Sequence, residues 1–183
     1  TASPDWLFKK ADAARREHCG DEIHVRGLIE FSNHCVRNCF YCGLRARNET
    51  VERYRLSVEE IAAAARSAAG MDIRTVVLQS GEDPWFTADR ICAVIRAVKA
   101  ASGAAVTLSV GARTKEEYES FRAAGADRFL LRFETSDPKL FAMLRPGTSL
   151  SGRLQCLEWL KASGFQTGSG VMVGLPGQSC ESL

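Results

Sequence analysis

The sequence predicts an α/β fold in which helices cover a parallel β-sheet. After residue 23, segments with helical periodicity alternate strictly with short apolar runs. Within each run the apolar residues follow one another with few interruptions, which is typical of strands buried on both faces. A (β/α)8 barrel and a doubly wound sheet both fit this alternation. No G-x-G-x-x-G follows the first expected strand, which weakens the dinucleotide-binding alternative and favours the barrel.

The first two expected elements are a helix and a strand. Ser3 and Pro4 indicate a helix start, with Ser3 as the N-cap and Pro4 at the first helical position. The helix should cover residues 6–18 and end near Gly20. The apolar run 23–31 is then expected to form the first strand of the sheet.

Four helix–strand repeats follow. Ser57 and Thr114 each precede a glutamate by three residues, which is the pattern of a capping box. Thr87 and Ser149 are expected to begin the other two helices. Each helix should end at a glycine that can adopt the left-handed conformation. The expected helices are 57–70, 87–103, 114–125 and 149–164, and the expected strands are 73–79, 104–110, 127–133 and 166–173.

Five strands are fewer than a closed barrel requires. A complete barrel has eight strands and typically about 250 residues, whereas this chain has 183. We therefore expect an open partial barrel with the first five β/α units of a longer protein. The expected division is an N-terminal helical segment, 1–22, and the N-terminal part of the barrel domain, 23–183.

Composition and charge narrow the class of protein. Apolar residues make up 45% and charged residues 25% of the chain, an ordinary balance for a soluble globular protein. The net charge of +2 gives no argument for a nucleic-acid or anionic membrane partner. The start of the chain lacks the apolar core of a signal peptide. Seven cysteines without an export signal predict a cytoplasmic protein with metal ligation instead of disulfides.

Three cysteines carry the strongest chemical signal. Cys35, Cys39 and Cys42 have the spacing C-x3-C-x2-C, with Tyr41 before the last. A structural zinc site usually takes four ligands, and no fourth candidate lies at a comparable spacing. Three thiolates on a 4Fe–4S cluster would leave one iron open for a substrate or cofactor. A zinc knuckle or three incidental core cysteines are the alternatives.

Other cysteines and histidines lack this pattern. Cys92 and Cys156 lie within helical patterns and are expected in the core, and Cys180 gives no indication. The remaining residues have no partner at ligand spacing and are interpreted as structural: Cys19, His24 and His34.

Polar residues and glycines gather where the expected strands end, which is where barrel enzymes place their active sites. Several of these residues also have a simpler structural interpretation. Glu82 and Asp83 precede a proline and fit a solvated turn, and Glu134 fits a surface carboxylate. Arg153 fits an exposed helix position, and residues 145–147 (Arg-Pro-Gly) fit a plain turn.

The cysteine motif with its aromatic residue resembles the signature of the radical S-adenosylmethionine (SAM) superfamily. The resemblance extends along the chain to the HydE family of FeFe-hydrogenase maturases within that superfamily. The stretches that carry it are IHVRGLIEFSNHCVRNCFYCGLR, VVLQSGEDPWF, AGADRFLLRFETSDPKLFAMLRPGTS and GSGVMVGLPGQ.

The resemblance implies roles for individual residues. The three cysteines would ligate a 4Fe–4S cluster and Arg153 would face the SAM carboxylate. No catalytic residue is assigned, and Phe133 stands where many relatives have His, which leaves that position without a role. The expected cofactor-binding residues are Tyr41 and Met172 with Val171 for adenine, Ser80, Gly81 and Glu82 for the methionyl amino group, Glu134 and Arg153, and the strand-end residues Gln79 and Ser109.

The resemblance also implies an activity. A reduced cluster would split SAM into methionine and a 5′-deoxyadenosyl radical, during assembly of the hydrogenase H-cluster from an iron–carbonyl–cyanide precursor. Expected partners are therefore a small-molecule or organometallic substrate and other maturation proteins. The alternatives are a methylornithine synthase-like or biotin synthase-like enzyme, or an inactive iron–sulfur or zinc-binding fragment. As an open partial barrel, the chain is expected to expose a large apolar concave surface and to be prone to aggregation.

Overall fold

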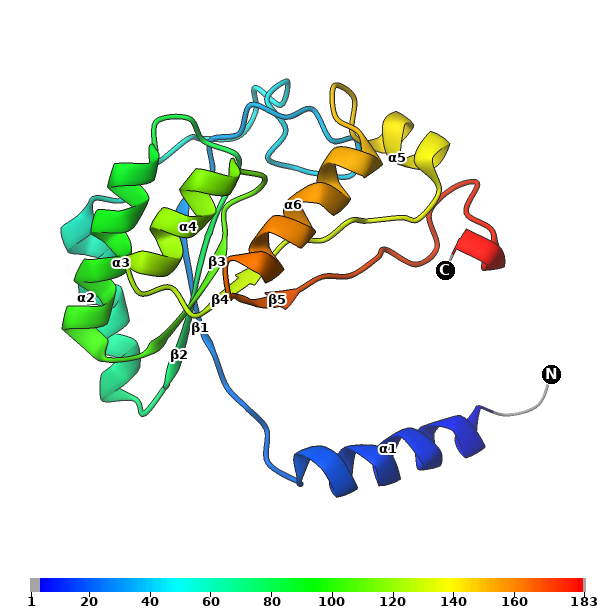
Figure 1. Cartoon of the computed structure of the whole chain (residues 1–183), viewed down its shortest axis with the longest axis horizontal. Coiled ribbons are helices and arrows are strands. Elements are labelled where there is room, and N and C mark those ends of the chain that lie inside the picture. Colours follow the sequence, from blue (N-terminus) through cyan, green and yellow to red (C-terminus); the bar gives the residue numbers. More distant parts are fainter. Residues whose placement is uncertain (1–3, 183) are drawn as a thin grey trace.

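The computed structural model describes residues 4–182, which form an open five-stranded parallel sheet with helices on one side (Figure 1). The strands lie in chain order, and every neighbouring pair is parallel. This arrangement confirms the predicted alternation and the partial barrel. The strands are β1 (Gly27–Ser32), β2 (Thr75–Ser80), β3 (Ala105–Ser109), β4 (Arg128–Leu130) and β5 (Gln166–Gly168).

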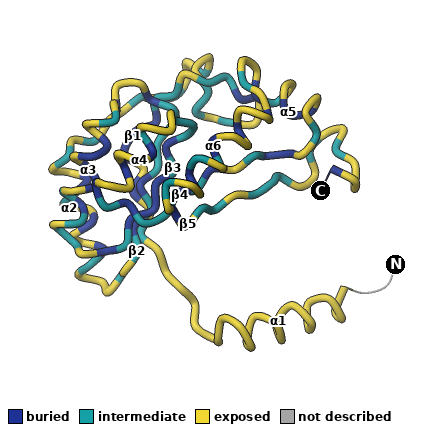
Figure 2. Tube along the Cα trace, in the orientation of Figure 1, coloured by how far each residue is buried: buried dark blue, intermediate teal, exposed yellow. Residues whose placement is uncertain are grey.

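The core lies between the sheet and the helices that connect its strands. Val76, Leu78, Val106 and Leu108 of the central strands are fully buried against them. Figure 2 shows buried backbone concentrated in this layer. The connecting helices are α2 (Val58–Gly70), α3 (Ala88–Ser102), α4 (Lys115–Ala123) and α6 (Leu150–Ala162).

The alternate strand positions, which face away from these helices, are largely polar. Gln79 donates to Glu30 at 3.2 Å, and Arg128 donates to Thr75 at 3.5 Å. On the first strand, the large apolar residue Leu28 is 57% exposed. The expectation of a large apolar concave surface is therefore wrong, because cross-strand polar pairs occupy much of it.

Helix starts follow the sequence signals closely. Ser57 with Glu60 and Thr114 with Glu117 form both predicted capping boxes, and Ser149 accepts from the Gly152 amide. Helix ends follow less closely. Gly103 is a left-handed C-cap with φ +63°, as predicted. At α2 the cap is Met71, Gly70 is the last helical residue, and the left-handed residue is Asp72.

All five strands are shorter than expected, and the first, fourth and fifth differ most. Residues 23–26 precede β1, and Ile23 and Val25 are 89% and 66% exposed there. The fourth and fifth strands end at Leu130 and Gly168, although an isolated bridge joins Glu134 and Val171 farther along. Glu134 has φ +71°, a left-handed conformation that interrupts a regular strand.

Two short helices were not predicted. Helix α5 (Pro138–Leu144) begins with Asp137, whose side chain accepts from the Lys139 and Leu140 amides. A single turn, η1 (Cys180–Ser182), follows the fifth strand region. Helix α5 is relevant to the site because the chain that leaves it runs directly over the cysteine loop.

Helix α1 (Asp5–Cys19) lies apart from the sheet, and it is exposed along its whole length (Figures 1 and 2). It confirms the predicted helix 6–18, but Pro4 is its N-cap and not its first helical residue. The predicted cap, Ser3, lies outside the described residues. None of the described helices combines the length and apolarity needed to cross a membrane.

Candidate functional site

The cysteine loop, residues 33–56, is held from within by one arginine. Arg53 donates to four backbone carbonyls, those of Asn33, Leu44, Arg45 and Asn48. The Asn33 side chain also donates to the Glu52 carbonyl and accepts from the Tyr54 amide. A loop without regular structure must satisfy its carbonyls by such contacts. The sequence analysis did not identify Arg53.

The three predicted ligands lie together in this loop. Cys39 is buried, whereas Cys35 and Cys42 are partly exposed. The Cys42 amide donates to the Cys39 carbonyl, and the Arg37 amide donates to the Cys35 sulfur at 3.4 Å. Burial raises the pKa of Cys39, the charge of Arg145 opposes this, and the other two thiols add to the rise.

The chemistry of these thiols suits a cluster, because three thiolates of one loop can ligate three irons of a 4Fe–4S cubane. Among residues 4–182, no group of three potential ligands converges as a single ion would require. In a 4Fe–4S cubane each cysteine ligates a different iron, so three sulfurs surround the cluster without converging on one point. An amide that already points at a ligand sulfur is a further feature of such sites.

The end of β2 contacts the cysteine loop at very close range. The Gly81 amide donates to the Ser32 carbonyl, and the Val36 amide donates to the Glu82 carbonyl. A Cβ atom at Gly81 would lie 2.2 Å from the His34 oxygen and 2.7 Å from the Cys35 Cβ. Glycine is therefore required at position 81 for the loop to pack against the strand.

Asp83 anchors the start of the same loop. Its fully buried carboxylate accepts from Ser32 and Arg55, each at 2.7 Å through Oδ2, and from Arg55 and the Trp85 amide through Oδ1. Burial alone would raise the pKa of Asp83, but these hydrogen bonds outweigh it and hold the pKa below its ordinary value. The interpretation of Asp83 as a solvated turn is wrong.

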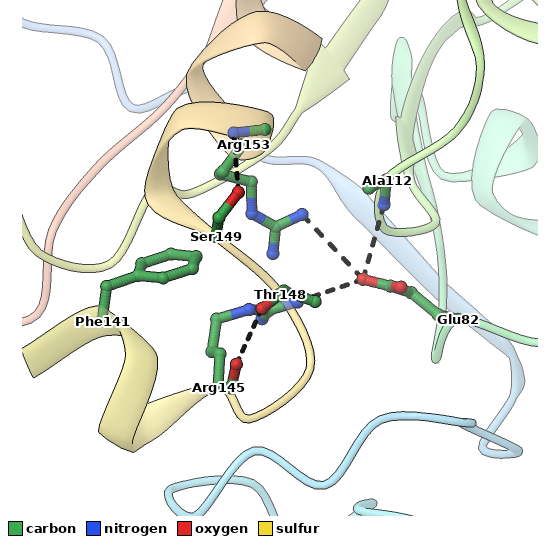
Figure 3. A pocket seen from close by; sticks show the side chains of 8 residues that line it. Glu82, Ala112, Phe141, Arg145, Thr148, Ser149 and Arg153 are labelled. Atoms are coloured by element: carbon green, nitrogen blue, oxygen red, sulfur yellow. Dashed lines mark hydrogen bonds and ion pairs between the residues drawn. The ribbon is translucent and has the colours of Figure 1, made fainter. Parts of the chain in front are cut away.

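Glu82 lies among three guanidinium groups, and Figure 3 shows two of them, those of Arg145 and Arg153. Its Oε2 accepts from Arg37, and its Oε1 lies 3.1 Å from Arg145 Nη2 and 3.9 Å from Arg153 Nη1. Burial would raise the pKa of Glu82, but the three arginines hold it below its ordinary value. A Cβ at Gly111 would lie 2.0 Å from the Glu82 Cγ, so this glycine makes room for the carboxylate.

Arg145 is the main site residue that the sequence analysis missed. Its main chain forms the predicted turn, since the Thr148 amide donates to the Arg145 carbonyl. Its side chain, however, is buried and donates to the Tyr41 hydroxyl at 2.8 Å as well as to Glu82. Burial raises the pKa of Tyr41, and the Arg145 charge acts in the opposite direction. No periodicity or spacing in the sequence marks this residue.

Glu134 and Arg153 are both buried at the same end of the sheet, so neither is the surface residue of the simpler interpretation. Glu134 is held by its backbone, which bonds to Gly170 and Met172. Its charge acts on both Arg153 and Tyr41. Burial lowers the pKa of Arg153, and repulsion from Arg145 adds to this.

A cavity of about 160 Å³ opens beside these arginines (Figure 3). Arg145 Nε and Arg153 Nη1 are buried and have no hydrogen-bond partner among the described residues. Buried polar groups in folded proteins are nearly always paired. The excess of positive charge therefore suits an anionic group, and an arginine can hold a carboxylate with parallel hydrogen bonds. The cavity is lined by Glu82, Ala112, Phe141, Arg145, Thr148, Ser149, Gly152 and Arg153.

The remaining predicted residues lie along the same edge of the sheet. Gln79 and Ser109 are partners in the β2–β3 register, and the Ser80 hydroxyl donates to the Gly81 carbonyl. Val171 forms the bridge with Glu134, and the Met172 amide donates to the Glu134 carbonyl. The structure thus brings the predicted set to one edge. Away from it, Cys92 and Cys156 are buried in the core as expected, and Cys19 and Cys180 are exposed.

Comparison with known families identifies this arrangement. Residues 29–183 match the family model of the radical SAM superfamily. The chain belongs to the radical SAM superfamily. Its cysteine loop after the first strand, followed by parallel strands that end in polar residues, is the part of the molecule covered by that match.

Individual radical SAM relatives are similar along nearly the whole chain. The [FeFe] hydrogenase maturase subunit HydE of Thermotoga maritima is 52% identical over 97% of this chain and 51% of its own length. The 3-methylornithine synthase of Methanosarcina barkeri is 31% identical over 96% of this chain and 50% of its own length. The chain therefore spans about half the length of these curated relatives.

Solved structures agree with this assignment. The crystal structure of methylornithine synthase (PylB) superposes with a TM-score of 0.93 at 29% identity, covering 100% of this chain and 55% of that one. The maturase HydG superposes with a TM-score of 0.85 at 26% identity, covering 96% of this chain and 41% of that one. These likenesses confirm the partial barrel as a radical SAM fold.

Proposed function

We propose that this chain forms the SAM-cleaving part of a radical SAM enzyme. Cys35, Cys39 and Cys42 would hold a 4Fe–4S cluster with one open iron. When bound, the cluster supplies the single electron that breaks a C–S bond of SAM and gives methionine and a 5′-deoxyadenosyl radical. The observation that carries the proposal is the hydrogen bond that joins the three-cysteine loop, through Tyr41, to Arg145, one of two buried arginines with an unpaired nitrogen among the described residues.

The chain's own residues would bind and orient SAM. Arg153 supplies a guanidinium for the carboxylate, and Glu134 supplies a buried carboxylate for the ammonium group. Charge-assisted hydrogen bonds of this kind fix both position and direction. Tyr41, Val171 and Met172 are proposed to contact the adenine. Glu82 already pairs with three arginines, so its assigned contact with the methionyl amino group stays a prediction, as do those of Ser80 and Gly81.

For the biological role we propose maturation of the FeFe-hydrogenase H-cluster, with an organometallic iron precursor as substrate and other maturation proteins as partners in the cytoplasm. The support is the 52% identity to HydE over nearly the whole chain. A methylornithine synthase-like reaction is the second candidate, because PylB has the TM-score of 0.93 despite its lower identity. A biotin synthase-like reaction is the third candidate, since the biotin synthase of Akkermansia muciniphila is 32% identical over 92% of the chain.

Iron loading tests the cluster. After anaerobic reconstitution with iron and sulfide, we expect about four irons per chain and a reducible 4Fe–4S spectrum. Cys39→Ser should abolish the signal. Cys92→Ser is the matched control, because Cys92 is equally buried, at 6%, but lies in α3 away from the loop. Stoichiometric zinc in anaerobically purified protein, with no cluster after reconstitution, would refute the proposal.

SAM binding tests the rest of the site. In the full-length protein, Glu134→Gln and Arg153→Ala should weaken SAM binding by about tenfold or more while the iron content stays constant, since each loses a charge-assisted hydrogen bond. Arg66→Ala, at an exposed position on α2, is the control. Equilibrium binding to the reconstituted protein measures the effect. Wild-type affinity in both site variants would remove these residues from the SAM site.

The two substrate classes are separated by the product. If the protein acts in H-cluster maturation, adding the full-length protein to a hydrogenase maturation mixture that contains no HydE should restore hydrogenase activity. Formation of 3-methylornithine, with no restoration of hydrogenase activity, would instead support the second candidate. The Cys39→Ser variant controls for effects that do not depend on the cluster.

A further inference from the structure

Arg145 links three parts of the site that are distant in sequence. It follows directly after α5, and its side chain is only 8% exposed. One guanidinium nitrogen donates to Tyr41 of the cysteine loop at 2.8 Å, and the other donates to Glu82 after β2 at 3.1 Å. A planar guanidinium presents its donors in a fixed fork, so the two contacts also fix the distance between their acceptors.

The backbone next to Arg145 also contacts the cysteine loop. The Phe40 amide, between Cys39 and Tyr41, donates to the Leu144 carbonyl at 3.0 Å. The Thr148 hydroxyl donates to the Arg145 carbonyl at 2.8 Å and fixes the turn from which the side chain extends. The cysteine loop is therefore fastened to the α5–α6 connection by its backbone and by one side chain at adjacent positions.

The charge of Arg145 is incompletely neutralised. Glu82 is shared with Arg37 and Arg153, and Arg145 Nε has no hydrogen-bond partner among the described residues. Arg145 directly follows Leu144, whose carbonyl accepts from the Phe40 amide, and Phe40 is the neighbour of Cys39, the buried cysteine of the motif. In a buried setting a charge is screened weakly, so a neighbouring cation stabilises any group that gains negative charge. The reduced state of an iron–sulfur cluster carries one more negative charge than the oxidised state.

We propose that Arg145 is a positioning residue that fastens Tyr41 and the cysteine loop to Glu82, and that its permanent positive charge raises the reduction potential of the cluster. The inference rests on the proposed 4Fe–4S cluster and adds an assignment for a residue outside the three ligands. An arginine suits both tasks, because it reaches two acceptors at once and stays charged at any working pH.

Redox titration of the reconstituted full-length protein, followed by electron paramagnetic resonance, tests the charge. Arg145→Gln should shift the cluster midpoint to a more negative potential. Arg145→Lys keeps the charge but cannot span both acceptors, so its potential should stay close to wild type. Arg47→Gln removes the same charge from an exposed position of the same loop and should leave the potential unchanged, because solvent screens it.

The positioning role has its own readout. Tyr41→Phe removes the acceptor but keeps Arg145, so it should leave the potential near wild type and weaken SAM binding severalfold. Arg145→Lys should weaken SAM binding to a similar extent, because both variants break the same link. If Arg145→Gln fails to hold a cluster, the comparison of Arg145→Lys with Tyr41→Phe still decides whether the link matters.

Separate outcomes overturn the inference and the proposed function. A wild-type midpoint in Arg145→Gln, or an equal shift in Arg47→Gln, would show that the Arg145 charge does not set the potential. Wild-type SAM affinity in both Tyr41→Phe and Arg145→Lys would show that the link does not position the loop. Absence of a cluster in the wild-type protein would instead contradict the proposed function itself.

Discussion

Asp83→Asn should destabilise the protein strongly, because its carboxylate is fully buried and satisfies four donors. Two of them, Ser32 Oγ and Arg55 Nε, bond to Oδ2 at 2.7 Å, and the other two, Arg55 Nη2 and the Trp85 amide, bond to Oδ1 at 3.0 and 3.1 Å. An asparagine keeps one acceptor oxygen and presents an NH2 group to the other pair of donors. The variant therefore loses two hydrogen bonds and leaves the Arg55 charge unpaired.

The magnitude follows from these losses. A hydrogen bond to a charged group contributes about 1.5–3 kcal/mol and a neutral one about 0.5–1.5 kcal/mol. Arg55 is about one-third exposed, so solvent reduces its share. We expect a loss of about 3 kcal/mol in the free energy of unfolding, or about 6–12 °C in melting temperature for a protein of this size. Iron retention should fall as well, because Ser32, the last residue of β1, directly precedes the cysteine loop.

The matched control is Asp72→Asn. Asp72 pairs with Arg74 at the same distance, 2.7 Å, but the two side chains are 81% and 85% exposed. Exposed ion pairs contribute about 0–1 kcal/mol. Asp72 has φ +59°, a conformation that asparagine also tolerates, so the substitution adds no strain. Thermal unfolding followed by circular dichroism measures both variants, and equal losses in the two would refute the argument from burial.

Two further predictions concern the cysteine loop and pH. Gly81→Ala should displace the loop and lower the iron content after reconstitution. Gly43→Ala should not, because a Cβ at Gly43 meets open space. Equal iron contents in the two variants would contradict the packing argument. Stability should also fall in acid, because the pKa values of Glu82 and Asp83 are held low in the folded protein. Their contribution is complete above the unfolded values, about 4.3 and 3.9, and is lost as pH falls through the folded values. Melting temperatures between pH 7 and 3 measure this, and Asp83→Asn should flatten the profile; an unchanged slope would exclude Asp83 as a cause.

Features that depend on neighbouring residues could be predicted from the sequence. Both capping boxes form where the Ser/Thr-x-x-Glu pattern placed them, because their partners are three residues apart. The alternation of helix and strand and the parallel order also follow from local apolar patterns. The spacing of Cys35, Cys39 and Cys42 identified the loop, since residues in one short loop must lie near one another.

Features that depend on distant contacts came from the tertiary structure alone. Arg145 looked like part of a turn, yet it bonds to a residue 104 positions away and to another 63 positions away. Glu82 looked like part of a solvated turn, yet three arginines from separate segments converge on it. The fourth and fifth strands end at Leu130 and Gly168, earlier than the apolar runs predicted, because the ends depend on pairing with a neighbouring strand. Periodicity records which face of an element is buried, whereas pairing between elements depends on how the whole sheet brings their ends together.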